Sequence, residues 1–225
     1  MSELTAGQEV NDQDFENINF EAQELRDLEV SNCRFLNCNF RRADLSGSRF
    51  TNCEFNDQQS ESPTDFSRAN LREVSFERCN LTVVNFTACK GYDLQFSNCQ
   101  LQGCDFETAD FRLPVGDSDL VGLTIRDSNL SFANFSNTYL AGCTINDSRM
   151  LECVLNYCDL SNADLMGNQM HGITAQGVTL QGADLRGAEF SGLDPRAIDL
   201  TGIKIYQSQA LTILDALEIE TDIDP

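Results

Sequence analysis

The chain has 225 residues and a formal net charge of −21, with 36 acidic residues against 15 basic ones. This balance argues against nucleic-acid binding, because phosphate contacts need clustered Lys and Arg, and it favours a basic partner instead. The sequence has no run of about eighteen apolar residues, so we expect no membrane helix. The N-terminus lacks the basic and apolar stretches of a secretory signal, which predicts a cytoplasmic protein.

Large apolar residues recur every five positions along most of the chain. Taking such a residue as position i, we find three runs, Phe15–Phe55, Phe66–Phe111 with a gap at Gly91, and Leu120–Ile205. Fourteen of the fifteen Phe residues keep this register, and Phe132 is the exception. A helix has a period of 3.6 residues and a strand a period of 2, so a period of five predicts neither a helical bundle nor an ordinary β-sandwich.

The position two residues before i holds small side chains, mostly Ala and Cys. All ten cysteines occupy it: Cys33, Cys38, Cys53, Cys79, Cys89, Cys99, Cys104, Cys143, Cys153 and Cys158. Because Ala and Val fill the same position elsewhere, we interpret the cysteines as small buried residues rather than as a disulfide framework. The single histidine, His171, lies at position i+1 and is expected to point outward, so we expect no metal site and no cofactor.

A chain that points positions i and i−2 inward must turn one corner every five residues. Four such sides form a square coil of about twenty residues, and stacked coils pair backbone to backbone at about 4.8 Å. The sequence therefore predicts an all-β solenoid over residues 13–205, preceded by a cap segment at residues 1–12. About ten coils give a rod of roughly 45 Å.

The register breaks twice, and these breaks are informative because the repeat itself is scaffold. The first break, residues 56–65, is polar and contains a proline, so it predicts an exposed loop. The second break, residues 112–124, contains Pro114 and Gly116, which predict a turn, while Leu120 keeps the register of the following coils. The alternative for both breaks is a tolerated insertion without function.

Residues 206–225 leave the five-residue register and carry apolar residues at helical spacing. We predict a short amphipathic helix followed by an acidic tail. The end of an open solenoid exposes unpaired strand edges, so this helix is expected to cap it. Its apolar stripe is larger than a cap needs, which predicts a dimer contact through Tyr206, Ala210, Leu211, Leu214 and Leu217.

The repeat units read A-(D/N)-L-x-x, as in Ala43-Asp44-Leu45, and by this pattern the chain resembles the pentapeptide-repeat family. That resemblance implies a right-handed quadrilateral β-helix. The chain further resembles the Qnr fluoroquinolone-resistance proteins, in which two loops interrupt the β-helix and a C-terminal α-helix follows it. The matching segments are residues 65–71 after the first break, residues 130–136 after the second, and Tyr206-Gln207 at the start of the Leu-rich tail.

The Qnr resemblance implies a bacterial protein that forms a head-to-head homodimer through its C-terminal ends. It also implies binding to DNA gyrase and topoisomerase IV and their protection from quinolones. The acidic rod suits DNA mimicry, because −21 over roughly 45 Å is about one charge per 2 Å, close to the charge density of B-DNA.

We expect the two register breaks to supply the partner contacts. Loop A consists of Asn56, Asp57, Gln58, Gln59, Ser60, Glu61, Ser62 and Pro63. Loop B consists of Arg112, Leu113, Pro114, Val115, Gly116, Asp117, Ser118 and Asp119. Asp and Asn recur at one repeat position, so no acid–base pair stands out and no enzyme is expected. Two alternatives stay open, an immunity factor against a gyrase-targeting peptide toxin and an acidic structural or adaptor solenoid with another partner.

Overall fold

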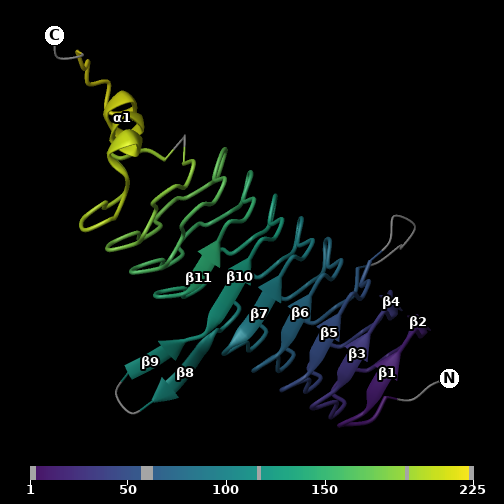
Figure 1. Cartoon of the computed structure of the whole chain (residues 1–225). Helices are drawn as coiled ribbons and strands as arrows, with labels where there is room; N and C mark the ends of the chain where they lie inside the picture. Colours follow the sequence, from purple (N-terminus) through teal and green to yellow (C-terminus); the bar gives the residue numbers. More distant parts are fainter. Residues whose placement is uncertain (1–3, 57–62, 116–117, 191–192, 223–225) are drawn as a thin grey trace.

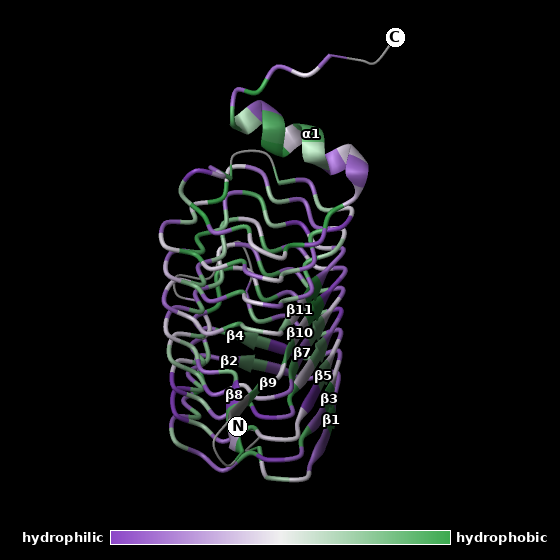
Figure 2. Ribbon diagram, turned by 90° about the vertical axis from the view of Figure 1, so that its left-hand side faces the viewer, coloured by the Kyte–Doolittle hydropathy of each residue, from purple (hydrophilic) through white to green (hydrophobic). Residues whose placement is uncertain are grey.

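The computed structural model describes residues 4–56, 63–115, 118–190 and 193–222 as a four-sided coil (Figure 1). Each regular circuit takes twenty residues, so that Glu9 pairs with Glu29 and Val10 with Val30 in a parallel ladder. The coils stack into a rod, with the N-terminus at one end and the helix α1 (Gln207–Ala216) across the other (Figure 2). The right-handed quadrilateral β-helix expected from the sequence is confirmed.

We call the face that carries the largest sheet face 1, and we number the other three faces in the order in which the chain reaches them. The first core residues of faces 2, 3 and 4 are Phe15, Phe20 and Leu25. Face 1 is a seven-stranded parallel sheet formed by β1 (Glu9–Asn11), β3 (Glu29–Ser31), β5 (Arg49–Thr51), β6 (Ser75–Glu77), β7 (Leu94–Ser97), β10 (Leu123–Arg126) and β11 (Thr144–Asn146). On face 2, β2 (Asp14–Glu16) pairs with β4 (Arg34–Leu36). Since β1 already pairs with β3, the coil begins within the segment that the sequence assigned to the cap.

Most corners are formed by a residue with positive φ, two positions after i. Asn, Asp and Gly are common there because they tolerate the left-handed region. Val83 (φ 56°) and Phe132 (φ 64°) are bulky exceptions, and both side chains are exposed, by 45% and 58%. Phe132 thus leaves the core register for a corner, where the left-handed conformation costs about 1–2 kcal/mol.

Stacked aromatic rings form the central part of the core. On face 3 the rings of Phe20, Phe40, Phe66, Phe86, Phe106 and Phe135 stack coil upon coil at centroid distances of 4.7–5.4 Å. All six are buried, and each contributes about 1.5–3 kcal/mol by leaving water, with a further contribution of about 0.5–1.5 kcal/mol from each aromatic pair. The register between coils is therefore fixed by the stacked rings of the core as well as by the backbone hydrogen bonds between coils.

Two irregular core positions have simple explanations. The gap at Gly91 is filled from the next coil, because a Cβ at Gly91 would lie only 2.9 Å from the ring of Phe111. The expectation that Leu120 is a core residue is wrong: its side chain is 49% exposed, and Leu123 is the buried residue that restarts the coil. Leu120 lies five positions before Ile125 but pairs with Leu113 in a hairpin outside the coil.

All ten cysteines are buried and unpaired, as the register predicted. Burial raises the pKa of the Cys38 thiol to about 11 and of Cys89 and Cys153 to about 12, so these thiols stay protonated at neutral pH. They contribute as packing atoms and weak hydrogen-bonding groups rather than as nucleophiles.

The cysteines on face 2 have a second role that the sequence did not reveal. On other faces the backbone N–H at position i−2 usually closes a turn, as that of Ala43 does with the carbonyl of Phe40 at 2.9 Å. The N–H of Leu28 on face 1, which donates to Ser48 Oγ, is an exception. On face 2 the N–H at position i−2 instead meets the i−2 side chain of the next coil: Cys53 N–H donates to Cys79 Sγ at 3.5 Å and Cys99 N–H to Ser128 Oγ at 3.0 Å. The inward positions of this face therefore hold thiols, hydroxyls and an amide, namely Cys33, Cys53, Cys79, Cys99, Ser128, Ser148 and Asn168.

At the N-terminal end, the buried side chain of Leu4 covers the first coil. Among the described residues, no helix has the length and apolarity that crossing a membrane requires.

Candidate functional site

Loop A leaves the coil at the corner between faces 2 and 3. Residues 57–62 lie outside the described residues, so the structure fixes only the two ends of this loop, Asn56 and Pro63. Thr64 and Asp65, which the sequence placed inside the break, already belong to the coil: Thr64 is buried and its Oγ1 donates to the carbonyl of Phe35 at 2.7 Å. Partners across loop A are 26 residues apart rather than 20, so the insertion adds six residues without disturbing the ladder.

Loop B is an antiparallel hairpin that projects from the rod between faces 4 and 1 (Figure 1). Its strands β8 (Arg112–Val115) and β9 (Ser118–Val121) pair Arg112 with Val121 and Leu113 with Leu120. The prediction of a turn at Pro114 is wrong, because Pro114 lies within β8 opposite Asp119. Gly116 and Asp117 of the predicted loop lie outside the described residues.

A sequence signal for this hairpin existed. Two residues, Gly116-Asp117, separate the segments Leu-Pro-Val and Ser-Asp-Leu-Val, and a Gly-containing pair between apolar segments is typical of a β-hairpin. The hairpin exposes apolar side chains, since Val115 is 48% and Leu120 49% open to solvent.

The base of the hairpin is held by close packing and by one arginine. A Cβ at Gly122 would lie 2.5 Å from the backbone nitrogen of Asp93, so only glycine lets the chain rejoin the coil here. Arg112 Nε bonds to Asp110 Oδ1 at 2.8 Å, and its guanidinium lies 5.6 Å from the ring centre of Tyr139. Burial opposes ionisation of Asp110, but the hydrogen bonds from Arg112 outweigh it and lower the pKa of this carboxyl.

At the C-terminal end, α1 is fixed to the last coils by side chains near both of its ends. Gln209 donates to the carbonyls of Leu185 (2.7 Å) and Ala188 (2.8 Å), and its Oε1 accepts from the N–H groups of Tyr206 (2.7 Å) and Gly187 (3.1 Å). Arg196 donates to the last helical carbonyls, those of Ala216 and Leu217, each at 2.9 Å. Cations at a helix C-terminus satisfy unpaired carbonyls and the helix dipole.

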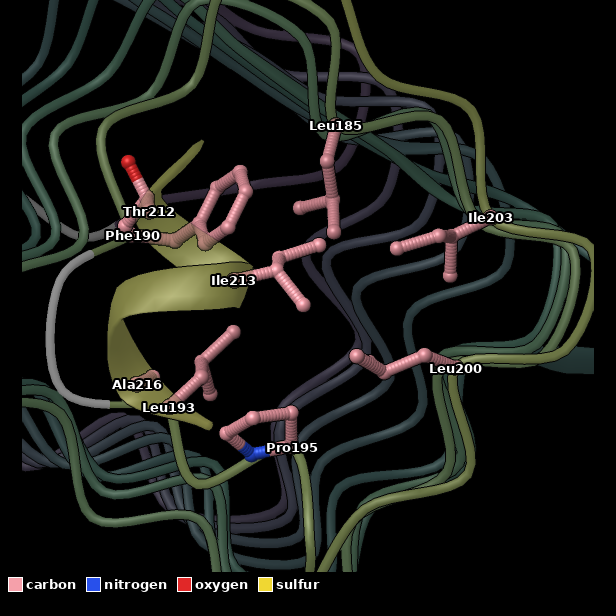
Figure 3. A pocket seen from close by; sticks show the side chains of 9 residues that line it. All are labelled: Leu185, Phe190, Leu193, Pro195, Leu200, Ile203, Thr212, Ile213 and Ala216. Carbon is pink, nitrogen blue, oxygen red and sulfur yellow. The ribbon is translucent and has the colours of Figure 1, made fainter. Parts of the chain in front are cut away.

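Between these two anchors α1 covers the open end of the core. Figure 3 shows Ile213 pointing from the helix toward Leu185 and Leu193, around a small apolar cavity of about 20 Å³. The full lining is Leu185, Phe190, Leu193, Pro195, Leu200, Ile203, Thr212, Ile213 and Ala216. The helix predicted near the start of residues 206–225 is observed as α1, Gln207–Ala216, and it covers the end of the coil as expected. Its inward residue is Ile213, which the predicted stripe omitted.

The stripe predicted for dimer contact lies away from this cavity. Tyr206 and Leu211 are 54% and 53% exposed, and Ala210, Leu214 and Leu217 are half-buried. None of these five residues lines the cavity under the helix. The helix therefore presents one apolar side to its own coil and a second one outward.

Two Asp residues at position i−1, the buried Asp184 and the exposed Asp199, brace the coil near its C-terminal end. Asp184 accepts hydrogen bonds from the side chain and backbone of Arg186, and these lower its pKa; the hydroxyl and N–H of Thr201 do the same for Asp199. Both carboxyls are therefore ionised at neutral pH.

The described residues contain no group of three or more His, Cys, Asp or Glu side chains that could hold a metal ion. His171 points outward as predicted, and its Nε2 lies 2.9 Å from Glu189 Oε2.

Comparisons with known proteins agree with this architecture. The descriptions "Pentapeptide repeat region", over residues 61–130, and "Pentapeptide repeats (8 copies)", over residues 14–57, 133–167 and 152–182, both match the chain. Full-length QnrB1, a plasmid-mediated fluoroquinolone resistance protein, superposes with a TM-score of 0.89 at 28% identity, covering 94% of this chain and 100% of that one. A trypsin-treated variant of QnrB1 gives 0.87 at 29% identity, covering 93% and 99%. No curated protein sequence matches significantly.

Proposed function

The chain belongs to the pentapeptide-repeat family, and on this basis we propose that it is a non-enzymatic protein that binds a type II topoisomerase and protects it from quinolones. The observation that carries the proposal is the similarity to QnrB1, which extends over nearly the whole of both chains. DNA gyrase and topoisomerase IV are the targets that the Qnr resemblance implies.

The two loops are the proposed contact elements. The rod is built from near-identical coils, and loops A and B are where the chain departs from them. Loop B offers exposed apolar side chains on a hairpin whose base is anchored by Arg112 and Gly122, so it can pack against a partner with little loss of conformational freedom.

The acidic exterior supports a DNA-mimic component. About one negative charge per 2 Å of rod approaches the charge density of duplex DNA, so a basic DNA-binding surface would attract the rod over a similar length. Contact through charge alone would weaken steeply with salt, whereas contact through the loops would depend on their sequence.

The coil spacing allows loop deletions that keep the register. Removing residues 58–63 leaves Phe55-Asn56-Asp57-Thr64-Asp65-Phe66, which restores the five-residue spacing and leaves Asp57 at the corner, where Asp12 and Asp93 already adopt positive φ. Removing residues 113–121 leaves Phe111-Arg112-Gly122-Leu123-Thr124-Ile125, with Gly122 at the corner. Both variants are expected to fold as uninterrupted solenoids.

The test is gyrase supercoiling in the presence of ciprofloxacin, with wild type and each deletion variant compared at equal concentration. We expect each folded deletion to protect at least about tenfold less well, because a lost anchor at an interface commonly costs more than about 1.4 kcal/mol. Circular dichroism and thermal unfolding establish that the variants are folded. If both folded variants protect as well as wild type, the loops are not the contact elements.

A further inference from the structure

Basic side chains gather at one corner of this acidic rod. The corner between faces 3 and 4 carries Ala22, Arg42, Arg68 and Ala88 in successive coils, all with positive φ. The N–H of Arg42 donates to the carbonyl of Ser67 at 3.1 Å, which sets Arg42 beside Arg68 one coil apart. Both arginines are exposed, and the alanines on either side leave room around them.

Three more cations surround this pair. Arg41 precedes Arg42 in the chain, and Arg72 follows Arg68 on face 4, where Asn70 and Lys90 pair in successive coils. We name the set the basic corner; it consists of Arg41, Arg42, Arg68, Arg72 and Lys90.

The basic corner has no ion-pair partner within the part of the chain that the structure describes. Seven other arginines do pair with carboxylates, namely Arg26, Arg34, Arg49, Arg78, Arg112, Arg186 and Arg196. Eight of the fifteen Lys and Arg side chains form no ion pair among the described residues, and five of those eight lie together at this corner. The gathering of five such cations in neighbouring coils of an acidic rod is what needs an explanation.

Of the carboxylates near the basic corner, Asp44 and Asp65 are engaged by other groups, and Asp110, opposite Lys90, pairs with Arg112. Glu73, next to Arg72, is exposed and forms no ion pair with it. Asp44 accepts from Arg26 Nε at 2.6 Å, from Ser46 Oγ at 2.7 Å and from Asn70 Nδ2 at 2.8 Å. Asp65 accepts from the N–H of Ser67 at 2.8 Å. Like charges on directly neighbouring strands destabilise a sheet, so the Arg42–Arg68 pair costs folding free energy that an external anion would recover.

We propose that the basic corner binds a short acidic segment of a partner protein. Arginine suits this role because its planar guanidinium holds a carboxylate through two parallel hydrogen bonds. The rest of the acidic surface opposes such a contact little, since charges more than about 8 Å away are screened at physiological salt.

The length of the patch favours a short protein segment over a nucleic acid. On face 3 the outward residues next to the corner run Glu21, Arg41, Ser67, Thr87 and Glu107 through successive coils. An extended polyanion lying along the rod would therefore meet a glutamate on each side of the arginines. A segment that spans about three coils, roughly 10–15 Å, avoids both.

This inference goes beyond the proposed function and does not depend on it. A basic DNA-binding surface would be repelled by the basic corner, so this corner is expected to face away from such a surface or toward an acidic element of the same complex.

The test is fluorescence anisotropy of a labelled glutamate decapeptide with the full-length protein, without any topoisomerase. The variant R42E/R68E reverses two charges inside the patch. The matched control R126E/R149E makes the same change in net charge at two exposed arginines that lie outside the patch and form no ion pair among the described residues. A glutamine decapeptide and a short DNA duplex serve as alternative probes.

We expect the glutamate peptide to bind wild type and the control variant alike, and to bind R42E/R68E at least about tenfold more weakly. Binding should also fall when salt rises from about 50 mM to about 300 mM. The proposal is overturned if the peptide does not bind wild type, if both double variants lose binding equally, or if the DNA duplex binds the patch more tightly than the peptide.

Discussion

At the scale of single residues, one backbone position on face 2 explains why four of the ten cysteines follow one another on that face. The N–H at position i−2 cannot close a turn there, and a thiol or hydroxyl from the next coil accepts it. A buried N–H without a partner costs about 1–3 kcal/mol, so alanine is a poor substitute at these positions although it fits the space.

The hydrogen bond to the thiol predicts that two chemically identical Cys→Ala substitutions lower the free energy of unfolding by different amounts. Cys79→Ala should lower the free energy of unfolding by about 1–3 kcal/mol more than Cys89→Ala, because Cys79 accepts from the N–H of Cys53, whereas the N–H one coil before Cys89, that of Ala69, closes an ordinary turn with Phe66. Cys79→Ser should recover part of the loss. Urea denaturation of the three variants measures the difference, and equal midpoints for the two alanine variants would refute the assigned role.

Val83 gives a second prediction at this scale. Its β-branched side chain is exposed at a corner with φ 56°, so Val83→Asn should raise the free energy of unfolding by about 1 kcal/mol by relieving the left-handed strain. Val154→Asn is the matched control, because Val154 lies at position i−1, outside the corners with positive φ, and should gain nothing. Thermal unfolding is the measurement, and an unstable Val83→Asn variant would contradict the account.

At the scale of elements, the helix α1 is held in place mainly by side-chain contacts with the last coils. No residue of the helix is fully buried, and Gln209, Ile213 and the partner Arg196 carry its attachment. Without them the last coil would expose the apolar residues around the cavity.

Gln209→Ala should therefore release the helix while leaving the coils intact. It removes four hydrogen bonds, two of them to coil carbonyls, and we expect faster hydrogen exchange in residues 207–216 together with a loss of about 2 kcal/mol in docking free energy. Gln207→Ala, at an exposed position of the same helix, is the control and should leave exchange unchanged. Equal protection in both variants would show that Gln209 is not the anchor.

The same elements show which features of the fold could be predicted from the sequence and which could not. The coil could be predicted because a period of five leaves one way to bury positions i and i−2, and Phe66 and Phe86 obey it. Loop B could not be placed correctly because Leu120 matches the register by coincidence and only its partners reveal a hairpin. Helical spacing predicted α1. Because the helix has two apolar sides, the spacing alone could not show which side covers the coil, and Ile213 was therefore not predicted as its inward residue.

At the scale of the whole molecule, the outward side of α1 is suited to pair with a second copy, end to end. Leu211→Glu should weaken such a dimer by at least about tenfold, because it places a charge in the apolar stripe. Ser208→Glu adds the same charge to the same helix outside the stripe and should leave the dimer intact. Light scattering after size exclusion, over a range of protein concentrations, distinguishes the two; a monomeric wild type would contradict the predicted contact.

The rod as a whole combines a rigid Phe-stacked core, an acidic exterior, two loops and a capped end, and the proposed function uses the last three. The most direct test is a titration of the full-length protein into purified DNA gyrase with ciprofloxacin, read by supercoiling. The account predicts that supercoiling returns at low protein concentration and is inhibited when the acidic rod is in large excess. A flat response, with no return of supercoiling at any concentration, would contradict the claim that this protein protects the enzyme.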